Sequence, residues 1–358
     1  MEGVRRRAPR PTRRQFVQGF TGLGLSAGGL PLLAGCSRLS TPVAPAAPSP
    51  PDAPLETTAI RIPRGIPKDS GLCFAPQYLA EGLFRAKGLT NVQYIDMPAG
   101  DIMAETAAGT VDMAMGTAAG VMLQVDTDDS MVIIAGIHVG CYELFANPTV
   151  HSMSDLKGKT VGVTALGSGR HVHLAVMTSY VGIDLNRDAT LVTDAPAEAI
   201  RRFSAGEIDA FMANPPEPQL LRSQGVGQVI VNTRTDRPWS QYFCCMLAAN
   251  RAFVQQHPVA TKRGLRAFLE AADICANEPE RAARGIVDGG FAADYDVTLQ
   301  MFKDVAYDRW REYDPEDTVR FYALRLHEIG MIKSSPERIL SQGTNWRFLN
   351  ELKQELKV

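Results

Sequence analysis

The sequence has no excess of charge of either sign, since 37 Lys and Arg residues stand against 39 Asp and Glu residues, for a formal net charge of −2. A nucleic acid is therefore not expected as a partner, because a protein that binds the phosphate backbone needs a clustered basic surface. Beyond residue 57 the chain also lacks a long apolar run, and a membrane-spanning helix takes about 20 such residues. We therefore expect a globular protein that does not cross the membrane.

The first 35 residues predict an export signal. Basic residues gather before residue 15, and an apolar stretch from Phe16 to Leu33 follows, which is the order found in signal peptides. Arg13 and Arg14 resemble the paired arginines of a twin-arginine export signal. Residues 33–36 read Leu-Ala-Gly-Cys, which resembles a lipobox, so Cys36 is expected to carry the lipid and to begin the mature chain. We expect the protein on the periplasmic or cell-surface side of the cytoplasmic membrane.

Large apolar side chains are nearly absent between residues 37 and 54, which are rich in Pro, Ala and Ser. Such a stretch cannot bury a core, so we assign residues 36–56 to a semi-rigid tether. If Cys36 is the anchor, an odd number of cysteines remains: Cys73, Cys141, Cys244, Cys245 and Cys275. An odd number cannot pair completely, and adjacent cysteines in an apolar run favour buried free thiols over a disulfide framework.

The remaining chain is too long for one simple core and suits two lobes. Strand-like and helix-like segments alternate along it, which is the pattern of an α/β protein. We assign lobe one to residues 57–143 and 244–358, and lobe two to residues 144–243. The chain is expected to cross between the lobes near residues 142–146 and 242–247, and the C-terminal helices are expected to pack back on lobe one.

A short motif occurs twice, as Gly109-Thr110-Val111-Asp112 and as Gly206-Glu207-Ile208-Asp209. In both copies the glycine is expected to end a helix in the left-handed conformation, and a short buried strand follows. The two copies indicate two lobes of similar build.

The chain resembles solute-binding proteins of the nitrate, taurine, aliphatic-sulfonate and thiamine-pyrimidine group, over most of residues 58–345. The resemblance rests on the repeated motif and on three further segments, residues 71–76 (Gly-Leu-Cys-Phe-Ala-Pro), 155–161 (Asp-Leu-Lys-Gly-Lys-Thr-Val) and 167–171 (Gly-Ser-Gly-Arg-His). It implies a type II periplasmic-binding fold and a ligand held between the lobes. It also implies delivery of that solute to an ABC permease and its ATPase, with no cofactor or metal and no catalysis.

The candidate ligand-binding residues follow strand ends or stand beside the chain crossings, because ligands of open α/β sheets lie beyond the carboxyl ends of the strands. They are Gly71, Phe74, Gly116, Thr117, Ser168, Gly169, Arg170, His171, Asn214 and Trp239. Ser168 can cap a helix whose start accepts an anion. Arg170 either meets a ligand oxygen or faces solvent, and Trp239 either stacks on a planar ligand or fills the hinge. The expected solute is small and organic, anionic or heteroaromatic.

Three other interpretations fit parts of the sequence. His171 and His173 resemble a metal pair, but on a helix they point about 200° apart, so no metal site is expected. A synthase of the thiamine-pyrimidine branch would need a cysteine-rich motif, and Cys244-Cys245 is only a pair. A ligand-sensing subunit of a membrane receptor would have the same cleft, so the sequence leaves this alternative open. The protein is expected to act as a monomer.

Overall fold

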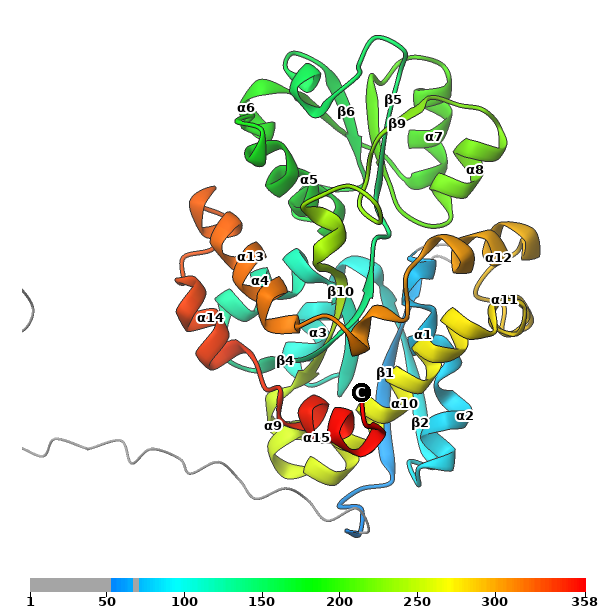
Figure 1. The fold of residues 1–358 in the computed structure, drawn as a ribbon, viewed down its shortest axis with the longest axis vertical. Helices are drawn as coiled ribbons and strands as arrows, with labels where there is room; N and C mark the ends of the chain where they lie inside the picture. The colour runs from blue at the N-terminus through cyan, green and yellow to red at the C-terminus, as the bar shows by residue number, and fades with distance from the viewer. Residues whose placement is uncertain (1–52, 67–70) are drawn as a thin grey trace, which may run out of the picture. The chain divides into compact units, whose positions relative to one another are not determined.

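The computed structural model describes residues 53–66 and 71–358. The export signal with Arg13 and Arg14, the anchor Cys36 and most of the tether lie outside the described residues. The described chain forms two lobes, and in Figure 1 lobe two is the green part, while lobe one contains both the blue-cyan and the yellow-red parts. The chain passes between the lobes before β5 (Glu143–Ala146) and again before β10 (Phe243–Asn250).

Lobe one is built on β1 (Ala59–Ile66), β2 (Asn91–Pro98), β3 (Met113–Thr117), β4 (Met131–Val139) and β10. The strands β1 and β2 pair in parallel, and β10 runs antiparallel between β3 and β4. Asp112 joins the two parts, because its carboxylate accepts a hydrogen bond of 2.7 Å from the backbone N–H of Arg61 at the start of β1. The strand order across lobe one is therefore β2, β1, β3, β10, β4.

Lobe two has a single sheet with the strand order β7 (Thr190–Thr193), β6 (Thr160–Val163), β8 (Ala210–Ala213), β5, β9 (Gln228–Asn232). Here β5 is the antiparallel strand, and it pairs with β8 and β9. The order matches that of lobe one strand for strand, with β6 in the place of β1 and β8 in the place of β3.

The repeated motif occupies the same place in both lobes. Gly109 and Gly206 follow helices and have φ angles of +78° and +74°, which favour glycine. The carboxylate of Asp209 accepts a hydrogen bond of 2.9 Å from the N–H of Thr160 at the start of β6, as Asp112 does for Arg61. Each aspartate thus ties the residues before one strand to the start of the strand beside it.

Helices cover the sheets of both lobes (Figure 1). Those of lobe one before the first crossing are α1 (Ala75–Leu79), α2 (Glu81–Ala86), α3 (Ile102–Ala108) and α4 (Ala118–Thr127), preceded by the short 3-10 turn Leu72–Phe74. Those after the second crossing are α9 (Arg251–Gln256), α10 (Pro258–Asn277), α11 (Pro279–Asp288), α12 (Tyr295–Asp304), α13 (Pro315–Glu328), α14 (Pro336–Gly343) and α15 (Arg347–Leu356). Lobe two carries α5 (Gly169–Tyr180), α6 (Leu185–Asp188), α7 (Pro196–Ser204) and α8 (Glu217–Ser223).

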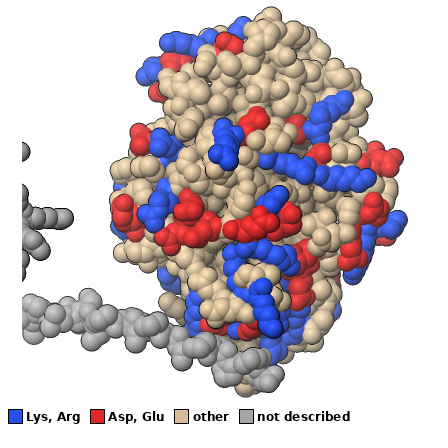
Figure 2. All heavy atoms as spheres, in the orientation of Figure 1, with Lys and Arg blue, Asp and Glu red and all other residues tan. Residues whose placement is uncertain are grey.

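The core of lobe one surrounds β4 and β10, in which every residue is buried. Helices on both faces explain why these strands are continuous apolar runs. Within the described residues, no helix is long and apolar enough to span a bilayer. On the face that Figure 2 shows, basic and acidic side chains are interspersed, which agrees with the balanced composition.

Candidate functional site

A cavity of about 510 Å³ lies between the lobes, at the carboxyl ends of their central strands. From lobe one it is lined by Gly71, Phe74, Ala99, Gly100, Ile102, Met103, Ala104, Met115, Gly116, Thr117, Gly120, Leu123, Gln124 and Thr127. From lobe two it is lined by Thr164, Ala165, Gly167, Ser168, Gly169, Arg170, Ala195, Pro196 and Asn214, with Tyr142 at the first crossing. A concave, largely apolar space with a few polar groups is typical of a small-molecule site.

The lobe-two side of the cavity is the start of α5. Ser168 is the N-cap, and its hydroxyl accepts a hydrogen bond of 3.3 Å from the N–H of His171. The N–H groups of Gly169 and Arg170, the first two residues of α5, have no acceptor among the described residues. Helix starts leave such donors unpaired, and they bind anionic or other acceptor groups. The cavity therefore presents free backbone donors to whatever fills it.

The lobe-one side mirrors this arrangement. Thr117 ends β3 and caps α4, and its hydroxyl accepts a hydrogen bond of 3.3 Å from the N–H of Gly120. The starts of α4 and α5 meet across the cavity, because the Cα of Gly169 stands 3.8 Å from a Cβ built on Gly120. Two helix N-termini, one from each lobe, thus converge on the same space.

Arg170 is the charged residue among the lining residues that the structure describes, and its charge is already compensated. Its two terminal nitrogens each lie 2.9 Å from a carboxylate oxygen of Glu217, and both side chains are less than 8% exposed. Asn214 joins the pair, since its side-chain oxygen accepts from Arg170 and its N–H donates to Glu217 over 2.9 Å. The guanidinium also lies over the ring of Phe211. Arg170 therefore neither faces solvent nor stands free for a ligand.

Most of the residues chosen from the sequence line this cavity, but His171 and Trp239 do not. His171 is turned away, and its Nδ1 accepts a hydrogen bond of 3.0 Å from the N–H of Gly167. Burial lowers the pKa of His171, while a contact with Asn186 raises it less. Trp239 is buried edge-on against the rings of Tyr180 and Phe321, so it fills space beside the second crossing.

Sequence reasoning did not find several lining residues. Tyr142 lines the cavity and is held by a hydrogen bond of 3.0 Å from its N–H to the hydroxyl of Thr233. Its place at the chain crossing was the available signal. Met103 and Met115 give the cavity a flexible apolar wall, and no pattern in the sequence distinguishes them from core residues.

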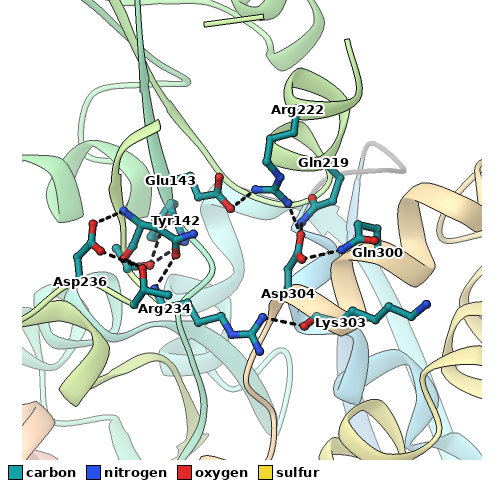
Figure 3. A network of polar contacts seen from close by, with 12 residues as sticks. Tyr142, Glu143, Gln219, Arg222, Arg234, Asp236, Gln300, Lys303 and Asp304 are labelled. Carbon is teal, nitrogen blue, oxygen red and sulfur yellow. Dashed lines mark hydrogen bonds and ion pairs between the residues drawn. The ribbon is translucent and has the colours of Figure 1, made fainter. Parts of the chain in front are cut away.

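A second set of contacts joins the lobes away from the cavity, on the side of α8 and α12 (Figure 3). Arg222 of lobe two forms ion pairs with Glu143 and with Asp304 at the end of α12. Gln219 and Gln300 each donate a hydrogen bond of 2.8 Å to Asp304. Arg234 adds a hydrogen bond of 2.7 Å to the carbonyl of Lys303. We call Glu143, Gln219, Arg222 and Asp304 the interlobe clasp.

Comparison with known proteins first defines the class. The structure of the periplasmic nitrate-binding protein NrtA from Synechocystis PCC 6803 aligns with a TM-score of 0.70 at 16% identity, covering 85% of this chain and 90% of that one. The alkanesulfonate-binding protein SsuA from Xanthomonas axonopodis pv. citri, bound to MOPS, aligns with a TM-score of 0.64 at 14% identity, covering 81% and 99%. The two-lobe type II periplasmic-binding fold that the sequence predicted is thereby confirmed.

The family follows from the sequence itself. Residues 77–287, more than half of the chain, match the NMT1-like family, and the chain belongs to that family. Over 101 residues it is 31% identical to the bicarbonate-binding protein CmpA of Synechococcus sp. (strain ATCC 27144 / PCC 6301 / SAUG 1402/1). That match covers 28% of this chain and 22% of CmpA, so it spans about a fifth of the relative's length.

Proposed function

We propose that this chain is the extracytoplasmic solute-binding component of an ABC importer, which captures a small organic solute between its lobes and delivers it to a permease and its ATPase. The proposal assigns no chemical step to the cavity. A shared fold does not by itself decide between binding and catalysis, whereas the geometry of the site bears on that choice. The similar proteins are named as bicarbonate-, nitrate- and alkanesulfonate-binding proteins, and these names agree with this class of function.

The observation that carries the proposal is the meeting of the starts of α4 and α5 at one cavity. Thr117 and Gly169 belong to different lobes, and both line it. A solute in the cavity contacts both lobes, so it stabilises the arrangement in which they are close. Two lobes joined by two chain crossings can close with small changes at the ends of elements. Closure on a solute is the signal that a permease can recognise.

The lining also bears on the chemistry of the solute. The Arg170 guanidinium is neutralised by Glu217, so the backbone N–H groups of Gly169 and Arg170 and the side-chain amide of Asn214 are the donors that we assign to the solute. They suit a carboxylate, sulfonate or other acceptor oxygen. Phe74, Met103 and Met115 provide apolar surface for the rest of the molecule. We therefore propose an organic solute with one acceptor group, bound in the micromolar range, which corresponds to about 8 kcal/mol.

Calorimetry on the refolded chain tests this proposal, because refolding removes solute carried over from expression. The panel contains nitrate, bicarbonate, alkanesulfonates, carboxylates and pyrimidines. The ligand that binds best should lose roughly fivefold in affinity in Asn214→Ala, or about 1 kcal/mol for one hydrogen bond. Asn91→Ala, on an exposed position of β2, is the matched control and should bind as the wild type does. Equal affinities of Asn214→Ala and the wild type would place the ligand elsewhere.

We also propose that the chain acts as a monomer held to the membrane by a lipid on Cys36, after export directed by Arg13 and Arg14. A lipobox after an apolar segment supports this location. Cys36→Ala should release the protein from the membrane fraction or block its processing, and mass spectrometry of the wild type should find diacylglycerol. Arg13→Lys with Arg14→Lys should stop export. Continued export of that double variant would point to the general secretory route.

A further inference from the structure

Four residues far apart in the sequence meet behind the solute cavity. Cys73 lies in the turn before α1, His138 near the end of β4, Cys141 at the first crossing and Cys245 in β10. Their ligand atoms all lie within 4.8 Å of one another, and each residue is at most 5% exposed. We call these four residues the thiol–imidazole cluster.

His138 is the member that a packing role does not explain. It is fully buried, and apart from a contact with the Cys73 thiol neither of its ring nitrogens has a hydrogen-bond partner of normal geometry among the described residues. Its ring packs edge-on against Tyr307, with centroids 5.0 Å apart, which satisfies neither nitrogen. An unpaired polar group in the interior is destabilising. A ligand bound to one nitrogen would remove that penalty.

The ligand atoms of the cluster favour a particular kind of metal ion. Three thiols, which are soft ligands once ionised, and one imidazole make up a Cys₃His set, and tetrahedral sites of this composition are a common structural zinc class. A metal–sulfur distance of about 2.3 Å places neighbouring sulfurs of a tetrahedron about 3.8 Å apart. The sulfurs of Cys141 and Cys245 lie 4.0 Å apart, close to that spacing. Four protein ligands leave no open position, so the arrangement suits a structural ion.

We propose that Cys73, His138, Cys141 and Cys245 bind one thiophilic metal ion in a closed tetrahedral site, for which Zn²⁺ is the best match. On binding, the three thiols become thiolates and release their protons to solvent, and the neutral imidazole gives one nitrogen lone pair. No electron transfer is involved. The proposal is independent of which solute the cavity takes.

The site lies at the junction of the lobes. Cys141 directly precedes Tyr142, which lines the cavity, and Cys73 directly precedes Phe74, which lines it too. An ion there ties the turn before α1 to the first crossing and to β10. It would stabilise the hinge, and any ion that binds only the folded state raises the melting temperature.

Cys244 provides the competing explanation. Its sulfur lies 2.6 Å from that of Cys141, closer than two thiols usually approach, so oxidation could join this pair. A disulfide would take Cys141 out of the cluster, because one sulfur cannot serve both bonds. It would also leave His138 buried and unpaired. The metal accounts for both His138 and the three thiols, and it is therefore the explanation that we adopt.

The test uses the full chain, purified with reductant, incubated with Zn²⁺ and passed through a weak chelating column. Elemental analysis should find about one zinc per chain. Co²⁺ in its place should give the thiolate charge-transfer and visible bands of a tetrahedral site. Cys245→Ser and His138→Gln should each lose at least tenfold in zinc affinity. Cys275→Ser, another fully buried cysteine, and Cys244→Ser are the matched controls and should keep the ion.

Two outcomes would overturn the proposal. One is wild-type protein without zinc and without the Co²⁺ bands. The other is Cys245→Ser protein that binds zinc as the wild type does. Counting free thiols in unfolded, unreduced protein detects a disulfide between Cys141 and Cys244. Such a disulfide would lower the count by two in the wild type, but not in a variant that lacks either of these cysteines. If a variant fails to fold, the Co²⁺ spectrum of the wild type still decides. Solute calorimetry on the same samples shows separately whether the cavity is a ligand site.

Discussion

Gly169 of lobe two lies directly against Thr117 of lobe one. A Cβ built on Gly169 would stand 2.4 Å from the hydroxyl oxygen of Thr117 and 3.0 Å from its methyl carbon. Cβ atoms do not approach other atoms so closely, so the close contact of the lobes requires glycine here. The requirement is steric, because no unusual φ angle is recorded for Gly169. With threonine at position 117, the start of α5 can therefore meet the start of α4 only in the absence of a side chain at position 169.

Gly169→Ala should therefore weaken solute binding by holding the lobes apart. Overpacking a tight contact costs about 1–3 kcal/mol, which corresponds to a loss of roughly 5- to 150-fold in affinity. Small-angle scattering with saturating solute should show a less compact protein than the wild type. Gly82→Ala is the matched control, because nothing lies within 4 Å of a Cβ at that exposed helical glycine.

The same contact predicts a rescue. Thr117→Ala removes both atoms nearest to the methyl group of Gly169→Ala. The double variant should therefore lose less solute affinity than the sum of the losses of the two single variants. Additive losses in this cycle would show that Gly169 and Thr117 do not act on each other.

Ser168 has two roles that can be separated by experiment. It caps α5 and it lines the cavity, so Ser168→Ala should lose about 1 kcal/mol of unfolding free energy and also solute affinity. Ser335 caps α14 in the same way, with 3.3 Å between its hydroxyl and the N–H of Arg338, but it does not line the cavity. Ser335→Ala should therefore lose stability alone. Chemical denaturation and calorimetry on both variants check this; equal affinity losses would mean that only helix stability matters.

Local sequence signals predicted much of the fold and of the lobe-two site. The Gly-x-[Ile/Val]-Asp repeat marked equivalent positions in the two sheets because helix ends and short buried strands are encoded locally. Ser168 was recognisable as a helix cap for the same reason. These features depend on residues within one turn or strand of each other.

Local sequence signals do not predict contacts between side chains that are far apart in the sequence. No local pattern marks Glu217 as a buried residue, yet it is 4% exposed and pairs with Arg170. The thiol–imidazole cluster draws on residues from 73 to 245, so no spacing rule reveals it. His171 and His173, which are close in sequence and resemble a metal pair, are not part of this cluster. Tertiary folding alone decides which distant side chains share a buried space.

The stability of the fold should fall when one partner of the buried Arg170–Glu217 pair is removed. Glu217→Ala leaves a buried guanidinium without its counter-ion, and such changes cost about 3–5 kcal/mol of unfolding free energy. Replacing both partners, with Arg170→Met and Glu217→Leu, should restore most of the loss. The exposed helical pair of Glu81 and Arg85 is the control, and Glu81→Ala should cost at most about 0.5 kcal/mol. Urea denaturation measures all three, and a small loss in Glu217→Ala would contradict the burial of the pair.

The interlobe clasp should contribute modestly to closure. Asp304→Asn keeps the shape of the side chain but removes the charge that Arg222 meets across the lobes. Because Arg222 is 35% exposed, the pair is worth no more than about 1 kcal/mol, and solute affinity should fall by no more than roughly fivefold. High salt should reduce the difference in solute affinity between Asp304→Asn and the wild type. Asp308→Asn alters an exposed ion pair within lobe one and should leave the affinity unchanged.

Two buried histidines predict a loss of stability in mild acid. Burial lowers the pKa of His173, which is fully buried with its Nε2 3.1 Å from the hydroxyl of Tyr322, and burial also lowers that of His171. The unfolded chain binds protons at these residues near pH 6.5, whereas the folded chain does not until the pH falls further. Since stability rises with pH where the unfolded state holds more protons, the free energy of unfolding should decrease as the pH falls below about 6.5.

Urea denaturation at pH 7.5 and pH 5.5 measures this loss, and His173→Gln should reduce it because glutamine does not titrate while it can still hydrogen-bond Tyr322. His327→Gln, at an exposed position of α13, is the control for the substitution itself. If His173→Gln loses as much stability in acid as the wild type does, His173 takes up its proton without cost to the fold. Protonated His173 would then donate from Nε2 to the hydroxyl of Tyr322 and find an acceptor or solvent for Nδ1.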